Sequence, residues 1–479
     1  MICISVSPTS RQLAKVDILN ASRQCDLIEL CLDQFIKEPD IGEMISGVDK
    51  PFLISCRRPE QGGKFEGNEE DRLKLLRTAI VAGPAYVELD FAIAKKIPRF
   101  GKTKRVVSYT RLEKPIGKFD ELFKRAKEVD ADILKVTSPT PTLDAAWPML
   151  IAISKKHDLP VVGMGLGMPG QTFTLLCRKY GAPWTYAALE KGMESYEGQP
   201  TVDDLNTIYD WSGIQKKTRF VGLVGFGEAS VKAAKLLNKG FQQKQTNLRC
   251  LPFKPGKLDR LSKMLEALKI NALFVSPVFG SEIIRFAKQQ DKAVKETGFV
   301  DFLVKKKESG WKAYNALSHV IYEELVETLH RQKEEENPFT RRHTLIIGTG
   351  EITLSVAKKI LEQKGMMSIT APNNTVTQRW ARELDIRHIP FAKVYDTSAD
   401  VVIFTDASLQ TGITKNDLNP SFLQPDMTVL DLSRYPEPSS FHQEAKERGC
   451  QLVDIDSIFK KQIARQFKAI TGEVYPDNL

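Results

Sequence analysis

Lys135 is the residue whose type and surroundings point most directly to chemistry. It lies in the apolar, strand-like run Ala131–Val136, immediately before the turn-forming segment Thr137–Pro141. Burial lowers the pKa of an ammonium group, and a lysine that is neutral near pH 7 can attack a ketone to form a Schiff base. The alternative is a lysine with a buried aliphatic stem whose ammonium reaches solvent at a sheet edge. We expect a partly buried amine with a depressed pKa, because the strand residues before it are apolar.

The first half of the chain supplies the elements that would position this lysine. Short apolar segments alternate with amphipathic helices, and strands are predicted at Ile2–Val6, Leu27–Leu32, Phe52–Ser55, Tyr86–Leu89, Arg105–Ser108, Ile133–Thr137, Val161–Met164 and Trp184–Ala187. Eight strand–helix units close most simply as a (β/α)8 barrel, with functional side chains at the C-terminal ends of the strands. Arg57, Ser108 and Lys135 occupy such positions.

The second half has the pattern of a separate α/β unit followed by a nucleotide-binding fold. The polar segment Trp211–Arg219 is the predicted linker, and a long helix is predicted over Ala316–Glu336. Thr344–Ile347, the turn at Gly348 and Gly350, and an amphipathic helix have the strand–glycine–helix order of a Rossmann unit. Later strands at Met367–Thr370, Val401–Thr405, Thr428–Leu432 and Gln451–Asp454, and a final helix at Ser457–Thr471, predict a doubly wound α/β domain.

Composition limits the classes of function. The chain has 479 residues, a hydrophobic content of 42% and a charged content of 27%, which is typical of a globular protein with two or three domains. It has no run of about 18 apolar residues, so we expect a cytoplasmic protein without a membrane partner. The seven cysteines lack metal-ligand spacing, which predicts no metal. The net charge of +9 is dispersed without interleaved aromatic residues, which favours anionic small molecules over nucleic acid.

The motifs around Lys135 resemble those of the type I 3-dehydroquinate dehydratases. The landmarks are, in chain order, Asp26–Asp33, Ile54–Gly63, Val87–Asp90, Val107–Thr110, Ala131–Val136, Gly163–Gly165 and Ser195–Gln199. The resemblance covers about residues 1–212. It implies a (β/α)8 barrel that removes water from 3-dehydroquinate through an imine on Lys135.

The same resemblance implies which residues hold the substrate. Glu29, Arg57, Ser195 and Gln199 match residues that bind the substrate carboxylate and hydroxyls in the family, and Gln61 stands in place of a glutamate. For each of them, the alternative is an ordinary surface or capping role.

Three departures from the family pattern fall on its chemistry. Cys31 replaces an arginine, Thr110 replaces the histidine that acts as general acid and base, and Phe173 stands where we place the arginine that clamps the substrate carboxylate. Loss of a general acid–base group typically lowers the rate by about 10²–10⁴-fold. The one histidine before the linker is His157, which we interpret as a surface cap at a helix end.

Residues 219–479 resemble a shikimate dehydrogenase, so the whole chain resembles the bifunctional dehydratase–dehydrogenases. The resemblance implies shikimate-binding roles for Asn238, Asn315 and Gln462. The two serines of the family's first motif are Val231 and Ala233.

The catalytic pair of this second family is missing. The segment Phe274–Glu282 lacks the family lysine, and the next lysine, Lys288, is predicted on the following helix. The family aspartate is Leu317, and Asp301 stands where a substrate-binding asparagine is expected.

The resemblance also implies NADP as a cofactor, bound around Gly348 and Gly350. Glu351 replaces the third glycine of that loop and puts a carboxylate where a pyrophosphate would bind at a helix N-terminus. The arginine of the family's motif for the 2′-phosphate is Asn374, and Arg379 could compensate one turn later. We therefore expect a Rossmann-shaped scaffold with little affinity for NADP.

The sequence predicts three parts: a barrel at residues 1–212, a substrate domain at 219–318 and a Rossmann-type domain at 319–479. One hypothesis is an enzyme with weak or altered Schiff-base chemistry at Lys135 and a silent dehydrogenase half. The other is a pseudoenzyme that senses a metabolite or binds a partner, and a third is a structural remnant without ligand. The expected ligands are small anionic cyclic hydroxy acids such as 3-dehydroquinate or shikimate, and a homo-oligomer is compatible with all three hypotheses.

Overall fold

The computed structural model describes residues 1–155, 157–276, 279–306, 310–332, 336–409 and 418–476. These residues form two compact units, one made of Met1–Gly222 with Thr246–Ile270 and the other of Leu223–Gln245 with Asn271–Leu479. No helix in the described ranges has the length and apolar character needed to cross a membrane.

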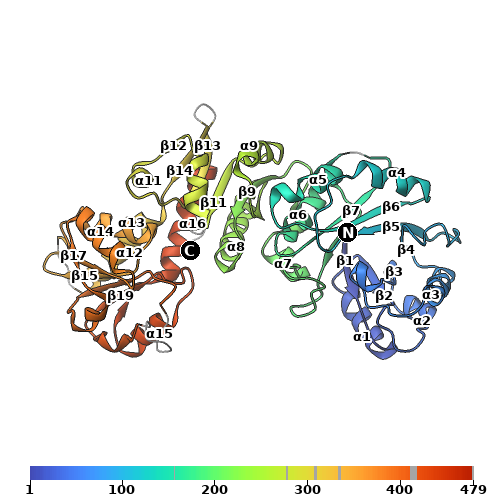
Figure 1. Ribbon diagram of the computed structural model, residues 1–479, viewed down its shortest axis with the longest axis horizontal. Coiled ribbons are helices and arrows are strands. Elements are labelled where there is room, and N and C mark those ends of the chain that lie inside the picture. The colour runs from blue at the N-terminus through green and yellow to red at the C-terminus, as the bar shows by residue number, and fades with distance from the viewer. Residues whose placement is uncertain (156, 277–278, 307–309, 333–335, 410–417, 477–479) are drawn as a thin grey trace. The chain divides into compact units, whose positions relative to one another are not determined.

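The first unit is built on a nearly closed, eight-stranded parallel barrel (Figure 1). Its strands follow the order β7-β6-β5-β4-β3-β2-β1-β8. The strands are β1 Ile2–Val6, β2 Leu27–Cys31, β3 Phe52–Ser55, β4 Tyr86–Asp90, β5 Lys104–Thr110, β6 Ile133–Pro139, β7 Val161–Leu166 and β8 Thr185–Ala187. The helices are α1 Arg11–Ser22, α2 Ile41–Ser46, α3 Glu69–Val81, α4 Asp120–Glu128, α5 Leu143–Ser154, α6 Gly170–Tyr180 and α7 Val202–Thr207. The (β/α)8 prediction is confirmed.

Alternation along the strands explains how a polar cluster comes to lie inside the barrel. Apolar side chains from these strands pack together in one cluster. Its members are Cys3, Leu27, Leu53, Val106, Ile133, Val162, Trp184 and Tyr186. Side chains two positions apart on a strand share a face. Residues two positions further on therefore form the next layer toward the C-terminal ends, and Glu29 follows Leu27 while Lys135 follows Ile133.

A second sheet has the order β10-β9-β11-β13-β14-β12. Its strands are β9 Arg219–Val224, β10 Leu248–Phe253, β11 Ala272–Val275, β12 Gln289–Gln290, β13 Phe302–Lys306 and β14 Gly310–Tyr314, and the helices in this part of the chain are α8 Glu228–Gln243, α9 Leu258–Ala267, α10 Gly280–Ile283 and α11 Lys292–Thr297. Strand β13 pairs antiparallel with both β11 and β14. The prediction that Lys288 lies on a helix is wrong: its backbone N–H pairs with the Trp311 carbonyl, immediately before β12.

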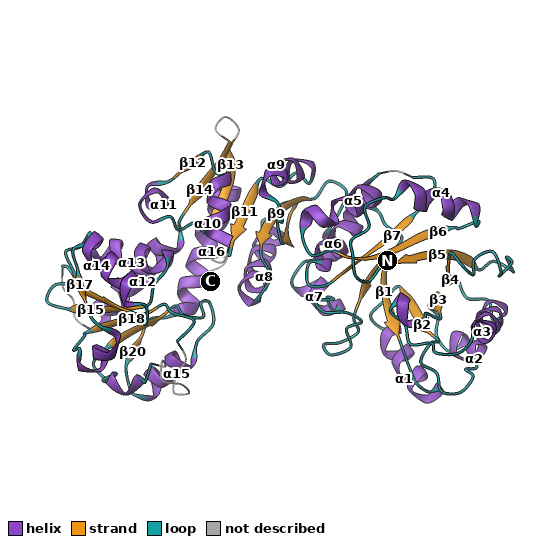
Figure 2. Ribbon diagram, in the orientation of Figure 1, coloured by secondary structure: helices purple, strands orange, loops and turns teal. Residues whose placement is uncertain are grey.

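The third sheet is parallel, with the order β17-β16-β15-β18-β19-β20 of a doubly wound Rossmann fold (Figure 2). The strands are β15 His343–Ile347, β16 Met366–Thr370, β17 Arg387–His388, β18 Val401–Phe404, β19 Thr428–Asp431 and β20 Gln451–Leu452. The helices are α12 Leu317–Gln332, α13 Glu351–Leu361, α14 Asn374–Leu384, α15 Ser440–Glu447 and α16 Ile455–Thr471. The predicted helix at 316–336 corresponds to α12, and residues 333–335 lie outside the described ranges.

Candidate functional site in the barrel and the second unit

Four charged side chains meet inside the barrel: Glu29 on β2, Arg57 after β3, Glu88 on β4 and Lys135 on β6. The Lys135 Nζ donates to Glu88 Oε2 at 2.9 Å and lies 3.7 Å from Glu29 Oε1. The Arg57 guanidinium donates to Glu88 through Nε at 2.9 Å and also contacts Glu29 through Nη2. Lys135 is 2% exposed and Glu29 is 1% exposed, so this is a buried cluster of two cations and two carboxylates.

The charges of this quartet stabilise one another. Burial opposes ionisation of Glu88, but the attraction of Arg57 and Lys135 outweighs burial and holds the pKa of Glu88 well below its usual range. Burial likewise disfavours the Arg57 cation, but Glu29 and Glu88 raise its pKa. Formation of a Schiff base requires the neutral amine of Lys135. The sequence-based expectation about the protonation of this lysine stays a prediction.

Tyr186 on β8 completes the surroundings of Lys135. Its ring centroid lies 4.6 Å from the Lys135 Nζ, which is within the range of a cation–π contact. Its hydroxyl is buried and has no hydrogen-bond partner among the described residues. Burial, together with the charge of Glu29, raises the pKa of this phenol well above its usual value, so it stays protonated. Sequence reasoning assigned no role to Tyr186 or Glu88. Glu88 could have been found, since it lies two positions after Tyr86 on a predicted strand.

A cavity of about 380 Å³ opens at the C-terminal end of the barrel. Its wall includes Ser5, Cys31, Asp33, Arg57, Lys64 and Ser195. Arg57 belongs to both the cavity wall and the charged quartet, whereas Lys135 does not line the cavity among the described residues. A ligand in this cavity therefore meets Arg57 before it reaches the lysine.

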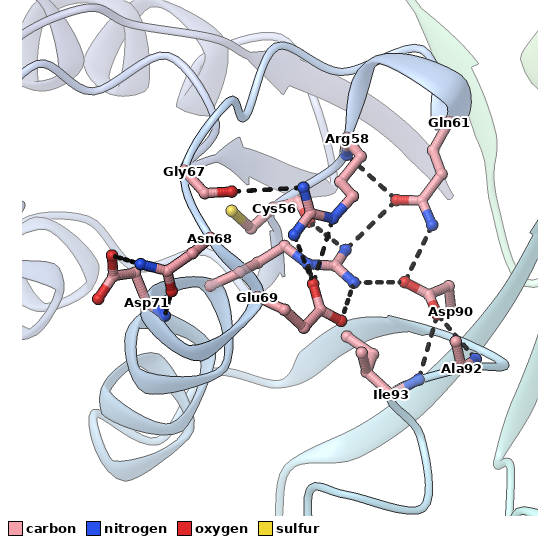
Figure 3. A network of polar contacts seen from close by, with 11 residues as sticks. Cys56, Arg58, Gln61, Gly67, Asn68, Glu69, Asp71, Asp90, Ala92 and Ile93 are labelled. Atoms are coloured by element: carbon pink, nitrogen blue, oxygen red, sulfur yellow. Dashed lines mark hydrogen bonds and ion pairs between the residues drawn. The ribbon is translucent and has the colours of Figure 1, made fainter.

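Gln61 lies in a different network from Lys135. Its Nε2 donates to Asp90 Oδ2 at 2.9 Å, and its Oε1 accepts from the Arg58 backbone at 3.2 Å and from Arg72 Nη1 at 3.4 Å (Figure 3). Arg72, only 2% exposed, also bonds to Glu69 and Asp90. In this structure, Gln61 fixes the loop after β3.

Ser195 and Gln199 belong to the loop that follows β8. The Gln199 Oε1 accepts from the Ser195 backbone N–H at 2.7 Å, and Gln199 is buried. Ser195 lines the cavity at the C-terminal end of the barrel, called the mouth cavity below. Gln199 holds the loop that carries Ser195. The structure thus brings Arg57 and Ser195 to one cavity, with Glu29 directly behind Arg57.

Comparison with known proteins agrees with this geometry. The family described as type I 3-dehydroquinase matches residues 2–216. The 3-dehydroquinate dehydratase of Thermococcus onnurineus is 30% identical over 204 residues, which cover 40% of this chain and 90% of that protein. This chain belongs to the type I 3-dehydroquinase family. The resemblance seen in the sequence motifs is confirmed.

The second half of this dehydroquinase-family chain also has relatives. The chloroplastic bifunctional 3-dehydroquinate dehydratase/shikimate dehydrogenase of Arabidopsis thaliana is 24% identical over 512 residues, which cover 100% of this chain and 83% of that protein. Among solved structures, the dehydroquinate dehydratase and shikimate dehydrogenase from S. pombe is 16% identical, with 99% of this chain and 96% of that chain covered and a TM-score of 0.42. The chain is a dehydroquinase barrel fused to a shikimate dehydrogenase-like region.

The three replacements in the dehydroquinase barrel have different surroundings. The Cys31 thiol lines the mouth cavity and accepts a hydrogen bond from Ser55 at 3.5 Å, and burial raises its pKa to about 12. Thr110 ends β5 and pairs with Thr137 of β6. Phe173 is 1% exposed on α6, where it packs toward Gly165, and it is not among the described residues that line the cavity. His157 stacks on the Phe123 ring with centroids 4.0 Å apart, which places it against α4.

Two of the three residues expected to bind shikimate in the second unit, Asn315 and Gln462, make hydrogen bonds within the protein. Asn315 donates to Ser355 Oγ at 2.8 Å and accepts from the Ser318 N–H, so it caps the start of α12. Gln462 on α16 donates to Asp301 Oδ2 at 2.9 Å. Asn238 is buried on α8. Of the three predicted ligands, Gln462 lines the cavity that the described residues form here, whereas Asn238 and Asn315 do not.

The turn before α13 keeps the backbone of a nucleotide-binding loop. Gly348 and Gly350 have backbone φ angles of 136° and 137°, which residues with a side chain rarely adopt. A Cβ at Gly348 would lie 2.2 Å from Thr405 Oγ1, whereas one at Gly350 would meet no atom within 4 Å. The backbone at Gly350 therefore faces open space.

The side chains around this turn do not fit a dinucleotide phosphate. Glu351 begins α13, and burial raises the pKa of its carboxyl. An ionised carboxylate there competes with a phosphate for the helix N-terminus. Asn373 caps α14 through the Val376 N–H. Arg379 is exposed and lies 3.8 Å from Glu383. No described group of three or more His, Cys, Asp or Glu side chains could hold a metal ion.

Proposed function

We propose that the barrel binds a small anionic cyclic hydroxy acid, such as 3-dehydroquinate, and forms a Schiff base on Lys135 with slow or altered turnover. The observation that carries this proposal is the contact of Lys135 with Glu88 and Glu29 behind Arg57, at the base of a cavity of about 380 Å³. The ligand's carboxylate would pair with Arg57 at the cavity wall, because arginine binds carboxylates through two hydrogen bonds.

The chemistry needs a lysine that gives up its proton. Glu88, the hydrogen-bond partner of Lys135, is the nearest proton acceptor, but its lowered pKa makes it a weak base, which also slows the reaction. The neutral amine then adds to the ketone carbon. Loss of the carbonyl oxygen as water leaves an imine, which draws electrons from the neighbouring carbon as that carbon loses a proton. That proton leaves with the β-hydroxyl as water when the double bond forms, and hydrolysis of the imine by a second water frees the lysine. Each proton transfer lacks the histidine that Thr110 replaces, so we expect turnover well below an ordinary rate of about 10 s⁻¹.

The second unit, in this proposal, does not transfer hydride between shikimate and NADP. Leu317 replaces the proton-transferring aspartate, and its backbone N–H instead binds Asp301. Glu351 opposes a phosphate at the start of α13. The loss of groups that act together typically costs several powers of ten in rate.

A binding module is the second candidate function. The feature that favours it is the closed quartet, in which Arg57 separates Lys135 from the cavity and two carboxylates hold the ammonium. A metabolite that pairs with Arg57 would alter the quartet without being turned over, so the barrel would act as a sensor in a cytoplasmic pathway.

Chemical trapping of the imine tests the hypothesis that the barrel is an enzyme. The full chain is incubated with 3-dehydroquinate and sodium borohydride, and peptides are analysed by mass spectrometry for a reduced adduct on Lys135. Lys135→Arg is the control, because it keeps the positive charge in the quartet but cannot form an imine. An adduct on Lys135 supports Schiff-base chemistry. Saturable binding without an adduct supports the sensor, and an adduct that persists in Lys135→Arg contradicts the assignment.

Calorimetric titration with NADPH tests the second half. We expect no binding in the micromolar range, and a gain of affinity in Glu351→Gly, which removes the carboxylate from the start of α13. Lys359→Gly is a control on the same helix, away from the turn. Micromolar binding by the unaltered chain together with shikimate oxidation would show that this half is an active dehydrogenase.

A further inference from the structure

The second unit contains a cavity whose chemistry differs from that of the barrel mouth. Its volume is about 70 Å³. The wall is mainly apolar and includes Leu223, Val224, Phe274, Phe299, Leu317 and Phe459. Asp301 is the one wall residue in the described part of the chain that carries a charge, and the wall holds no described lysine, arginine or histidine.

Hydrogen bonds within the protein already satisfy the acid in this wall. Asp301 Oδ1 accepts from the Ala316 N–H at 3.0 Å, and Oδ2 accepts from the Leu317 N–H at 2.8 Å and from Gln462 Nε2 at 2.9 Å. The other end of Gln462 accepts from the Tyr435 hydroxyl at 2.8 Å. These groups hold one another, and the negative charge of Asp301 repels a second anion.

Among the buried polar atoms of the described wall residues, one has no hydrogen-bond partner. Gln466 is 2% exposed, and its Oε1 is buried without a hydrogen-bond partner among the described residues. It lies on α16 one turn after Gln462, and both side chains line the cavity. A buried acceptor without a donor is unfavourable, so a bound molecule that donates a hydrogen bond to Gln466 would be preferred over one that cannot.

We infer that this cavity binds a small, uncharged, mainly apolar molecule with one hydrogen-bond donor, such as a short-chain alcohol, through the amide oxygen of Gln466. The volume suits only a few non-hydrogen atoms, since an engineered apolar cavity of about 150 Å³ holds benzene. A carboxylate is excluded, because the cavity offers Asp301 and no cation. This site is independent of Lys135 and of the function proposed for the barrel.

Three probes of nearly the same size and shape separate the contributions. 2-Propanol has a donor, acetone has only an acceptor, and acetate carries a negative charge. Each is titrated into the full chain labelled on Ile, Leu and Val methyl groups, and the chemical shifts of Leu223, Val224, Leu317 and Ile463 are followed by NMR. We expect saturable shifts with 2-propanol, affinity for acetone about fivefold lower because one hydrogen bond is missing, and no saturable shift with acetate.

Two cavity variants and one control variant make the test decisive. Gln466→Leu removes the acceptor at similar volume, so 2-propanol should bind no better than acetone, whereas Gln443→Leu, the same change on the exposed side of α15, should keep the preference. Ala233→Leu fills the cavity and should abolish the shifts, which covers the case in which Gln466→Leu does not fold. Equal affinity for alcohol and acetone in the unaltered chain, binding of acetate, or no saturable shift with 2-propanol would each overturn the inference.

Discussion

The charged quartet inside the barrel makes a quantitative prediction about stability. Lys135→Met leaves Glu29 and Glu88 with Arg57 alone, so the buried cluster gains a net charge of about −1. Glu88→Gln leaves the two cations with Glu29 alone, so the cluster gains a net charge of about +1. The double variant leaves the neutral pair of Arg57 and Glu29. The two substitutions should therefore compensate each other, because a buried unpaired charge is the main cost of either one.

The magnitude follows from the geometry. Opposite charges 2.9 Å apart attract by about 6 kcal/mol at an effective dielectric constant of about 20. Arg57 also contacts Glu88 and offsets part of the loss, so we expect each single variant to cost about 3–5 kcal/mol. The double variant should cost less than the sum by about 2–3 kcal/mol.

Hydrogen exchange measured by mass spectrometry suits this test, because the chain has two units and need not unfold in one step. Peptides that cover β5 and β6 report the free energy of opening the barrel. The control is the exposed pair formed by Lys127 and Asp158, whose atoms lie 3.0 Å apart. Exposed pairs contribute little, so Lys127→Met and Asp158→Asn should show no resolvable coupling. Additive effects of Lys135→Met and Glu88→Gln, within about 0.5 kcal/mol, would refute the quartet as the source of the cost.

Titration and activity provide further predictions. The lowered pKa of Glu88 means that its contribution to barrel stability is present above its unfolded pKa of about 4.3 and is lost as the pH falls toward the folded pKa. Glu88→Gln removes this titration, so the stability of the variant should fall less steeply at low pH than that of the unaltered chain. Burial raises the pKa of Asp301 to about 6, so stability of the second unit should fall by about 2–3 kcal/mol as the pH rises from 4 to 6, and Asp301→Asn should flatten that slope in urea titrations. Thr110→His combined with Cys31→Arg should raise the rate of dehydroquinate dehydration in a spectrophotometric assay by at least about tenfold, and an unchanged rate would show that other groups limit the reaction.

The strands of the barrel were predictable, because alternation and spacing are local properties of the sequence. Each predicted strand of the first unit corresponds to an observed one within about two residues. The burial of Lys135 was predictable for the same reason, since the apolar residues before it belong to the barrel core. The doubly wound domain was predictable from the glycine turn and the spacing of later strands, whereas the order of its strands comes from the structure.

The partners of the site residues were not predictable in the same way. Glu88 meets Lys135 only because the sheet closes, and they lie 47 positions apart in sequence. Gln61 was grouped with the substrate ligands from its position after Arg57, but the orientation of its loop turns it toward Asp90. The family resemblance puts Phe173 at the position of the arginine that clamps the substrate carboxylate, whereas the structure buries it in the core on α6. Side-chain direction at a loop or helix start depends on tertiary contacts that spacing alone does not contain.

The quartet separates two roles that one lysine can have. Its positive charge balances Glu29 and Glu88, and an arginine would also provide that charge. Its primary amine can add to a ketone, and no other side chain at this position would do so. Lys135→Arg should therefore lose any trapped adduct completely while losing less barrel stability than Lys135→Met. If both variants lost equal stability, the geometry of the lysine rather than its charge would hold the cluster together. If Lys135→Arg kept full stability and the unaltered chain formed no adduct, charge balance alone would explain the lysine, and the barrel would be a binding module.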